Sequence, residues 1–309
     1  MPTSLPASST QTSAEFHVNC ILLPTDFSDA SDRAACVARG VANHFRSKLF
    51  MVHAVWQKNY EWDASLYELE PSEDIGHKLT NQFVVNHKLD VLPHEVIVSS
   101  GSPLDVIKRV VEDKNIDLIV MGTNGLQGPA KLLFGNYSEQ IYRNAICPVL
   151  TVGPHVSPAK CSGNFQSIVF AMNPETAATA DALRYAIALT RACDAYLTVA
   201  SILSESQDVH GEELYKMEEQ RHAQIVKMLA ECQLALPHKP EIIVETGHIS
   251  EEIIKIAVGC GADLIVKGIR PATSVSGLSD LQPGHTYPIS VNAHCPVLTV
   301  GGFLGPSCH

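Results

Sequence analysis

The 309-residue chain is short of basic residues, aromatic side chains and long apolar runs, and these shortages exclude whole classes of protein. Lysine and arginine number 22 against 33 aspartates and glutamates, and the resulting net charge of −11 argues against a nucleic-acid partner. No stretch is apolar over a length that would span a membrane. The Ser-, Thr- and Pro-rich start lacks the basic-then-apolar order of a signal peptide, so we expect a cytoplasmic protein.

The sequence also lacks the short motifs of common catalytic and metal sites. Its nine cysteines are odd in number and form no CxxC pair, which predicts reduced thiols that are mostly buried as small apolar residues. There is no GxSxG elbow and no Walker lysine motif. His53, His285, His294 and Cys295 have no recognised ligand spacing, so a core or surface role is favoured over metal binding. We therefore assign no catalytic residue and no metal ligand.

The remaining composition describes two globular domains of ordinary size. The apolar fraction is 45%, which is enough for two cores in a chain of this length. Apolar runs alternate with segments of helical spacing, and this alternation predicts a parallel, doubly wound α/β fold. In the first half we expect strands at 20–23, 49–55, 94–99 and 117–121, with helices that start at Ser28 and Ser102 and a helix over 75–88 whose inner face carries Ile75, Leu79 and Phe83.

The second half of the sequence repeats the first. Asn144–Gly153 recurs as Asn292–Gly301, and Asp117–Gly122 recurs as Asp263–Gly268. A Pro-, Ser- and Gly-containing linker separates the two copies, and the chain is therefore a tandem duplication of one α/β unit. The predicted organisation is a disordered lead-in at 1–16, a domain at 17–153, a linker at 154–164, a domain at 165–302 and a tail at 303–309.

A glycine-rich loop follows the strand that ends at Gly122 and leads into a helix. Gly122, Gly125, Gly128 and Gly135 let a backbone approach a ligand closely, and unpaired amides at a helix start attract an anion. Single glycines between a strand and a helix more often make turns. Gly122, Gly125 and Gly135 at their spacing, at the carboxyl end of a buried strand, favour phosphate binding.

Polar residues near this loop have two readings each. Asn136 and Ser138 follow Gly135 and serve either as helix caps or as donors to a phosphate oxygen, and the two roles are compatible. Asp26 ends the first strand, where it is either a turn residue or an acceptor for an adenine amino group or ribose hydroxyls. Lys131 is either a solvated surface lysine or a contact to a terminal phosphate.

These residues resemble the universal stress protein family. The resemblance rests on Pro24-Thr25-Asp26-Phe27-Ser28, on His53, on Gly122-x-x-Gly125 with nine residues to Gly135, and on the Cys-Pro-Val-Leu-Thr-Val strands. It covers about Val18–Gly153 and Asn164–Gly301 as a tandem pair. It implies two domains, each a five-stranded parallel sheet of order 3-2-1-4-5 with helices on both faces, which pair through their last strands.

The nucleotide-binding branch of that family implies ATP, with or without Mg²⁺, across the loop of the first domain. Pro24, Thr25 and Asp26 would hold the adenosine, and Ala54 and Met121 would contact the base. The residues implied around the phosphates are Gly122, Asn124, Gly125, Gly135, Asn136, Tyr137 and Ser138. Where the family motif has Ser or Thr directly after the last glycine this chain has Asn136, so we expect weakened or altered phosphate contacts.

The second copy has lost these features. Asn173 stands where Asp26 stood, Ala171 replaces Pro24, and Ile269-Arg270-Pro271 replaces Thr123-Asn124-Gly125, so that a proline removes a backbone donor. The predicted function is a stress-response sensor or regulator that binds ATP in its first domain, with the second as a structural partner. The alternatives are an interaction scaffold without nucleotide, with an unknown protein partner, and a slow ATPase. A further homodimer also stays open.

Overall fold

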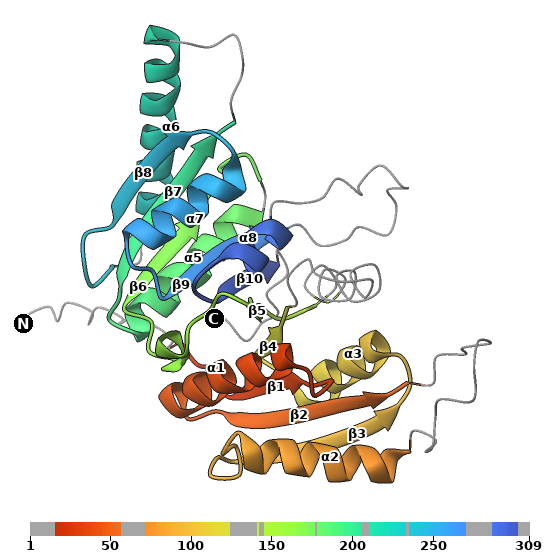
Figure 1. The fold of residues 1–309 in the computed structure, drawn as a ribbon. Coiled ribbons are helices and arrows are strands. Elements are labelled where there is room, and N and C mark those ends of the chain that lie inside the picture. Colours follow the sequence, from red (N-terminus) through yellow and green to blue (C-terminus); the bar gives the residue numbers. More distant parts are fainter. Residues whose placement is uncertain are drawn as a thin grey trace, which may run out of the picture.

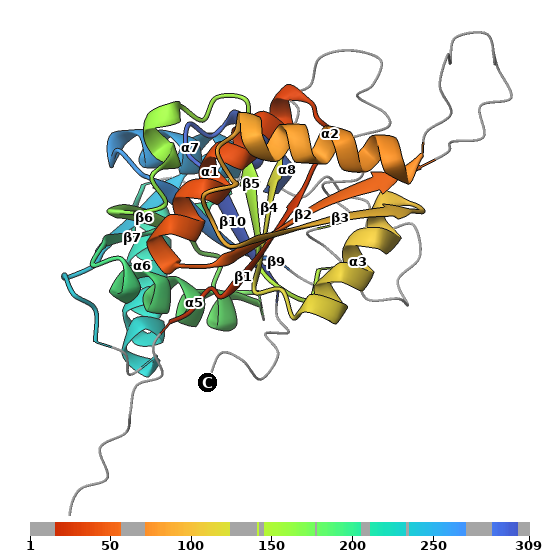
Figure 2. The same ribbon diagram turned by 90° about the horizontal axis from the view of Figure 1, so that it is seen from below.

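A computed structural model describes residues 16–56, 72–123, 141, 145–176, 178–204, 211–232, 235–269 and 286–301. Within these ranges the chain forms one ten-stranded sheet covered by helices on both faces (Figures 1 and 2). The elements in chain order are β1 (Cys20–Pro24), α1 (Asp29–Phe45), β2 (Lys48–Val55), α2 (Glu73–Asn86), β3 (His94–Ser100), α3 (Pro103–Lys114), β4 (Leu118–Gly122), β5 (Val149–Val152), the 3₁₀ turn η2 (Pro158–Cys161), β6 (Ser167–Ala171), α5 (Ala178–Ala192), β7 (Tyr196–Leu203), α6 (Glu212–Glu231), β8 (Glu241–Thr246), α7 (Ile249–Gly259), β9 (Leu264–Ile269), α8 (Thr286–Asn292) and β10 (Val297–Gly301).

The strand order confirms the predicted fold. It runs β3-β2-β1-β4-β5-β10-β9-β6-β7-β8, so that each half of the chain contributes an order of 3-2-1-4-5. All neighbours within a half are parallel, and the two halves join where β5 pairs antiparallel with β10, Leu150 opposite Leu298. The apolar strands predicted as buried runs are buried on both faces, as parallel strands covered by helices must be.

Alternate side chains of the strands supply different cores. Ile21 and Leu23 of β1 pack with α1, α2, α5 and α6 in a core that continues through both halves. Leu22 points to the opposite face, where it packs with α3 in a separate core. A third core, under α7 and α8, belongs to the second half. The two halves therefore share apolar packing on one face of the sheet.

The buried face of helix α2 differs from the predicted one. Leu79 is 47% exposed, and the buried residues are Gly76, Thr80, Phe83 and Val84. A Cβ at Gly76 would collide with the Val98 side chain, so the missing side chain lets α2 lie close to β3. Thr80 is tolerated inside because its hydroxyl donates to the Gly76 carbonyl oxygen at 2.8 Å. Close helix–sheet contact through small residues replaces the expected apolar stripe.

The cysteines also differ from their prediction. Eight are free among the residues that the structure describes, but only Cys193 and Cys295 are buried, and the other six are partly exposed. Their sequence positions did not show that several would lie at the edges of helices and strands. Within the same ranges, no helix combines the length and apolar character needed to cross a membrane.

Candidate functional site

The candidate site is the sheet edge where β1, β2 and β4 end. Strand β1 pairs in parallel with β2 on one side and β4 on the other, so the ends at Pro24, Val55 and Gly122 meet at one edge. The chain order reverses between β1 and β4, and the crevice beyond such a reversal is the usual ligand position in doubly wound sheets. Helix α1 starts at this edge.

The carboxylate of Asp26 is fixed by hydroxyl groups at the start of α1. Its Oδ1 accepts from the Ser28 amide at 3.1 Å, the Ser28 hydroxyl at 2.5 Å and the Ser31 hydroxyl at 2.7 Å. Within the described chain Oδ2 accepts no hydrogen bond. Partial burial raises the pKa of Asp26, but the bonds from Ser28 and Ser31 outweigh it, and the pKa lies below its usual value. The side chain is therefore an oriented anion with one oxygen left for a ligand.

Ser28 has a different role from the predicted one. It occupies the N-cap position of α1 with extended backbone dihedrals, but its side chain makes no cap hydrogen bond because its hydroxyl is turned to Asp26. By contrast, the predicted cap Ser102 is confirmed, since its hydroxyl oxygen accepts from the Asp105 amide at 3.3 Å. The first amides of α1 are thus left without the side-chain cap that α3 has.

A cluster of rings holds the turn after β1. Phe27 has φ = 62°, a left-handed conformation that is unusual for a bulky residue. Its ring centroid lies 4.6 Å from that of His53 and 6.0 Å from that of Phe83. His53 Nδ1 lies 3.0 Å from the Thr25 carbonyl oxygen and must carry the proton, because a carbonyl only accepts. This packing stabilises the turn that sets the direction of Asp26.

Packing against α1 requires a glycine at position 122. A Cβ at this position would collide with the backbone of Ala30 in the first turn of α1. The residue after it, Thr123, is buried, and its carbonyl oxygen accepts from Arg33 at 3.4 Å. Among the described residues, Thr123 Oγ1 and Arg33 Nε are buried polar atoms without a hydrogen-bond partner. Two donors of this kind beside the start of α1 suit an anionic ligand.

Six of the predicted site residues are described and lie on this edge or the strands that form it: Pro24, Thr25, Asp26, Ala54, Met121 and Gly122. Thr25 and Met121 are buried, and Ala54 is partly buried next to the end of β2. The remaining candidates lie outside the described residues, and the prediction for them stands untested: Asn124, Gly125, Gly128, Lys131, Gly135, Asn136, Tyr137 and Ser138. Residues 1–15 of the predicted lead-in at 1–16 also lie outside.

Sequence reasoning missed Ser31, which bonds Asp26, and Arg33, which bonds Thr123. Ser31 and Arg33 received no role, although both lie in the first turns of the helix that follows Asp26. The spacing Asp-x-Ser of Asp26 and Ser28 is a signal for a local side-chain turn and could have shown that Ser28 bonds the carboxylate. The contact of Arg33 with Thr123 had no local signal because 90 residues separate them.

The corresponding edge of the second half is built differently. The hydroxyls of Thr176 and Thr179 donate to the main-chain oxygen of Asn173 and not to a carboxylate. Lys267 replaces Met121, and burial lowers its pKa to about 8. Ile269, in place of Thr123, packs into the core formed with α3 in the first half. The described part of the second edge thus has main-chain bonding and apolar packing where the first edge has an oriented carboxylate and Thr123.

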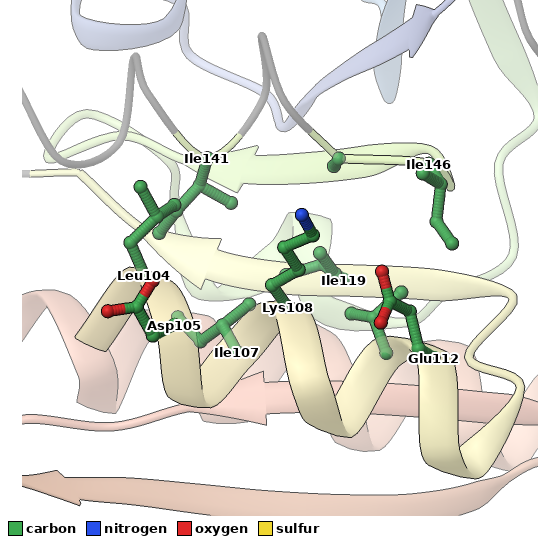
Figure 3. A pocket seen from close by; sticks show the side chains of 10 residues that line it. Leu104, Asp105, Ile107, Lys108, Glu112, Ile119, Ile141 and Ile146 are labelled. Atoms are coloured by element: carbon green, nitrogen blue, oxygen red, sulfur yellow. The ribbon is translucent and has the colours of Figure 1, made fainter. Parts of the chain in front are cut away.

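A separate groove of about 260 Å³ lies between α3 and the segment before β5 (Figure 3). Leu104, Ile107 and Ile141 line its apolar part, and Lys108 and Glu112 border it. None of the six described candidate nucleotide residues lines this groove. Among the described residues, no group of three or more potential metal ligands comes together.

Comparison with known proteins identifies the family. The model of the universal stress protein family matches residues 18–153 and again 164–301. A universal stress protein of Methanocaldococcus jannaschii is 31% identical over 143 residues, which are 43% of this chain and 80% of that protein. The crystal structure of a universal stress protein from Archaeoglobus fulgidus covers 94% of this chain and 100% of its own, with a TM-score of 0.67 and 20% identity, and shows the same fold.

A shorter universal stress protein was solved in complex with cAMP. It covers 44% of this chain, 98% of its own length is matched, and the two sequences are 21% identical. Its TM-score of 0.35 does not establish a shared structure. The two family matches account for both halves of the sheet and for the repeat in the sequence. The chain therefore belongs to the universal stress protein family, as a tandem pair of its domains.

Proposed function

We propose that the first domain, residues 17–153, binds an adenine nucleotide, ATP with or without Mg²⁺, and that the second, residues 165–302, is its structural partner. The observation that supports this most is the Asp26 carboxylate, which Ser28 and Ser31 orient at the crevice between β1 and β4. A carboxylate with a lowered pKa accepts hydrogen bonds from an adenine amino group or from ribose hydroxyls at neutral pH.

The other groups at the edge suit the remaining parts of a nucleotide. Ala54 and Met121 offer a small and an apolar surface for a base, and Arg33 brings a positive charge to the start of α1, where the unpaired amides attract phosphate. The glycine loop would hold the phosphates. On this proposal the protein is a stress-response sensor or regulator whose state follows its bound nucleotide, and hydrolysis is at most weak.

A calorimetric titration of the full chain with ATP tests the proposal, in the presence and absence of Mg²⁺. Asp26→Ala removes a charged acceptor and should weaken ATP binding about 10- to 100-fold, since hydrogen bonds to charged groups contribute about 1.5–3 kcal/mol. The matched control is Asn173→Ala, at the equivalent position of the second domain, which should leave the affinity unchanged. Gly125→Pro should weaken binding while leaving the Asp26 cluster intact.

Three outcomes would contradict the proposal. Wild-type protein that binds no adenine nucleotide would favour the scaffold alternative. Equal losses in Asp26→Ala and Asn173→Ala would place the ligand elsewhere. Unchanged ATP affinity in Gly125→Pro would show that the phosphates do not bind in the glycine loop.

A further inference from the structure

Two thiols from distant parts of the sequence lie together beside the linker. Cys36 is in the second turn of α1, and Cys161 is the last residue of η2, the 3₁₀ turn between the two domains. Burial first, and then hydrogen bonding to the Cys36 side chain, raise the pKa of the Cys161 thiol to about 12. Both cysteines are free and partly exposed, so small oxidants reach them.

Backbone packing fixes the pair in place. Gly40 follows Cys36 by one turn on the same face of α1, and a Cβ at Gly40 would collide with the backbone of Cys161 and Ser162. Gly163 has φ = 72° and lies against the backbone of Gly40 in turn. The linker turn is therefore seated directly on α1, and this contact holds the two sulfur atoms together.

The other described cysteines have different neighbours. The Cys193 sulfur lies 3.8 Å from His44 Nε2, and the Cys260 sulfur lies 3.8 Å from the Thr198 hydroxyl. Burial raises the pKa of the Cys147 thiol and of the Cys295 thiol to about 12. Among the eight described cysteines, Cys36 and Cys161 form the pair that is set up for an intramolecular bond.

We propose that Cys36 and Cys161 are a peroxide-sensitive dithiol that closes to a reversible disulfide and ties the linker to α1. The thiolate is the nucleophile in this chemistry. Burial and the hydrogen bond to the Cys36 side chain raise the pKa of Cys161 and keep that thiol protonated at neutral pH, so Cys36 reacts first. Its sulfur attacks one oxygen of hydrogen peroxide, which yields a Cys36 sulfenic acid and one water.

The second step closes the bond. The Cys161 sulfur attacks the Cys36 sulfenic sulfur, hydroxide leaves, and the Cys161 proton converts it to a second water. Overall, two thiols and one hydrogen peroxide give one disulfide and two waters, with both sulfurs oxidised and both peroxide oxygens reduced. The positive charge of Arg39 favours the thiolate of Cys161 in this step. A dithiol reductant reverses the reaction.

The bond would connect the two domains mechanically. Lys160, next to Cys161, donates to Asp263 at 2.6 Å and to the Gly261 carbonyl oxygen at 2.9 Å, and both acceptors belong to the second half. Cys36 belongs to the helix whose start carries the Asp26 cluster. A disulfide at this point therefore fastens a turn that is ion-paired to the second domain onto the first domain's site helix.

The experiment oxidises the reduced full-length protein with hydrogen peroxide, alkylates the remaining thiols and maps the peptides by mass spectrometry. We expect a cross-linked peptide pair containing Cys36 and Cys161, lost on treatment with dithiothreitol, while the other cysteines stay alkylated. Cys36→Ser and Cys161→Ser should each abolish the cross-link, and Cys232→Ser, which removes another partly exposed cysteine, should retain it.

Thermal melting supplies a second readout. Oxidised wild-type protein should melt at a higher temperature than the reduced protein, and the difference should vanish in Cys36→Ser and Cys161→Ser and persist in Cys232→Ser. Full alkylation of both cysteines after peroxide treatment would overturn the proposal. So would a Cys36 sulfinic acid beside an unreacted Cys161, or a melting difference that survives in either single variant.

Discussion

The two halves of this chain share a frame, meaning their strand order and the close packing of a helix start on the fourth strand, and they differ in the side chains at the ends of the strands. Each has the strand order 3-2-1-4-5, and each has a glycine in the last two residues of its fourth strand, Gly122 and Gly268, where a helix start packs closely. At the first edge two serines orient the carboxylate of Asp26, whereas at the second edge two threonines bond the main chain of Asn173. The frame is thus independent of the ligand, and a few side chains at the strand ends decide whether an edge presents a charged acceptor.

The largest expected effect tests the shared part of the frame. Gly122→Ala should destabilise the protein by about 3 kcal/mol, because its Cβ collides with the Ala30 backbone, which cannot rotate away. In Gly268→Ala the new Cβ would lie 2.9 Å from the Ala178 carbonyl oxygen, so a loss of about 1 kcal/mol is expected. Urea unfolding measures both. Equal losses would contradict the difference in clearance between the two glycines.

The next effect tests a difference between the halves, Met121 against Lys267. The buried amine of Lys267 is costly when charged, so Lys267→Met should stabilise the protein by up to about 3 kcal/mol at pH 7. Met121→Lys, the reverse exchange in the first half, should destabilise it by a similar amount, because Met121 is buried. Urea unfolding of both variants at one pH makes the comparison.

The pH dependence of Lys267→Met has a definite sign. The pKa of Lys267 falls from 10.5 to about 8 on folding, so between these values the unfolded chain binds more protons. Wild-type stability contributed by this group therefore rises with pH through that window. The advantage of the variant should shrink by about 1 kcal/mol from pH 7 to pH 9. An advantage that stays constant would show that charge is not its cause.

The smallest effect concerns two equivalent aspartates before the fourth strands. Asp117 Oδ2 accepts from the amides of Asn19 and Cys20, and Asp263 Oδ2 accepts from those of Gln166 and Ser167. Only Asp263 also pairs with a lysine, Lys160, at 2.6 Å. Asp263→Asn should therefore cost about 1 kcal/mol more than Asp117→Asn in urea unfolding, since both keep an amide-accepting oxygen.

A double-mutant cycle isolates that ion pair. With Lys160→Met already in place, the losses in Asp263→Asn and Asp117→Asn should become equal. A difference that persists in the Lys160→Met background would place its cause outside the ion pair.

Part of the site could be predicted because its signals are local. Asp26 was found from its place after a buried strand, and Ser102 was found as a cap from the Pro103 and Asp105 that follow it. The orientation of Asp26 could not be found in this way, since it depends on Ser31 folding back onto the turn and on the packing of Phe27 against His53 from the next strand. For the same reason Leu79 was misplaced, because its exposure is set by how closely Gly76 lets α2 approach β3.

The sequence by itself determined the tandem repeat, the α/β class and the strands, because apolar runs and helical spacing record which face of an element avoids water. It also showed that only the first half keeps the acidic strand end and the glycine spacing. The tertiary structure decided that β5 meets β10, that Gly122 makes room for α1, and that Cys36 meets Cys161. Those contacts join residues far apart in the chain, and their geometry arises only when the helices, strands and linker pack together.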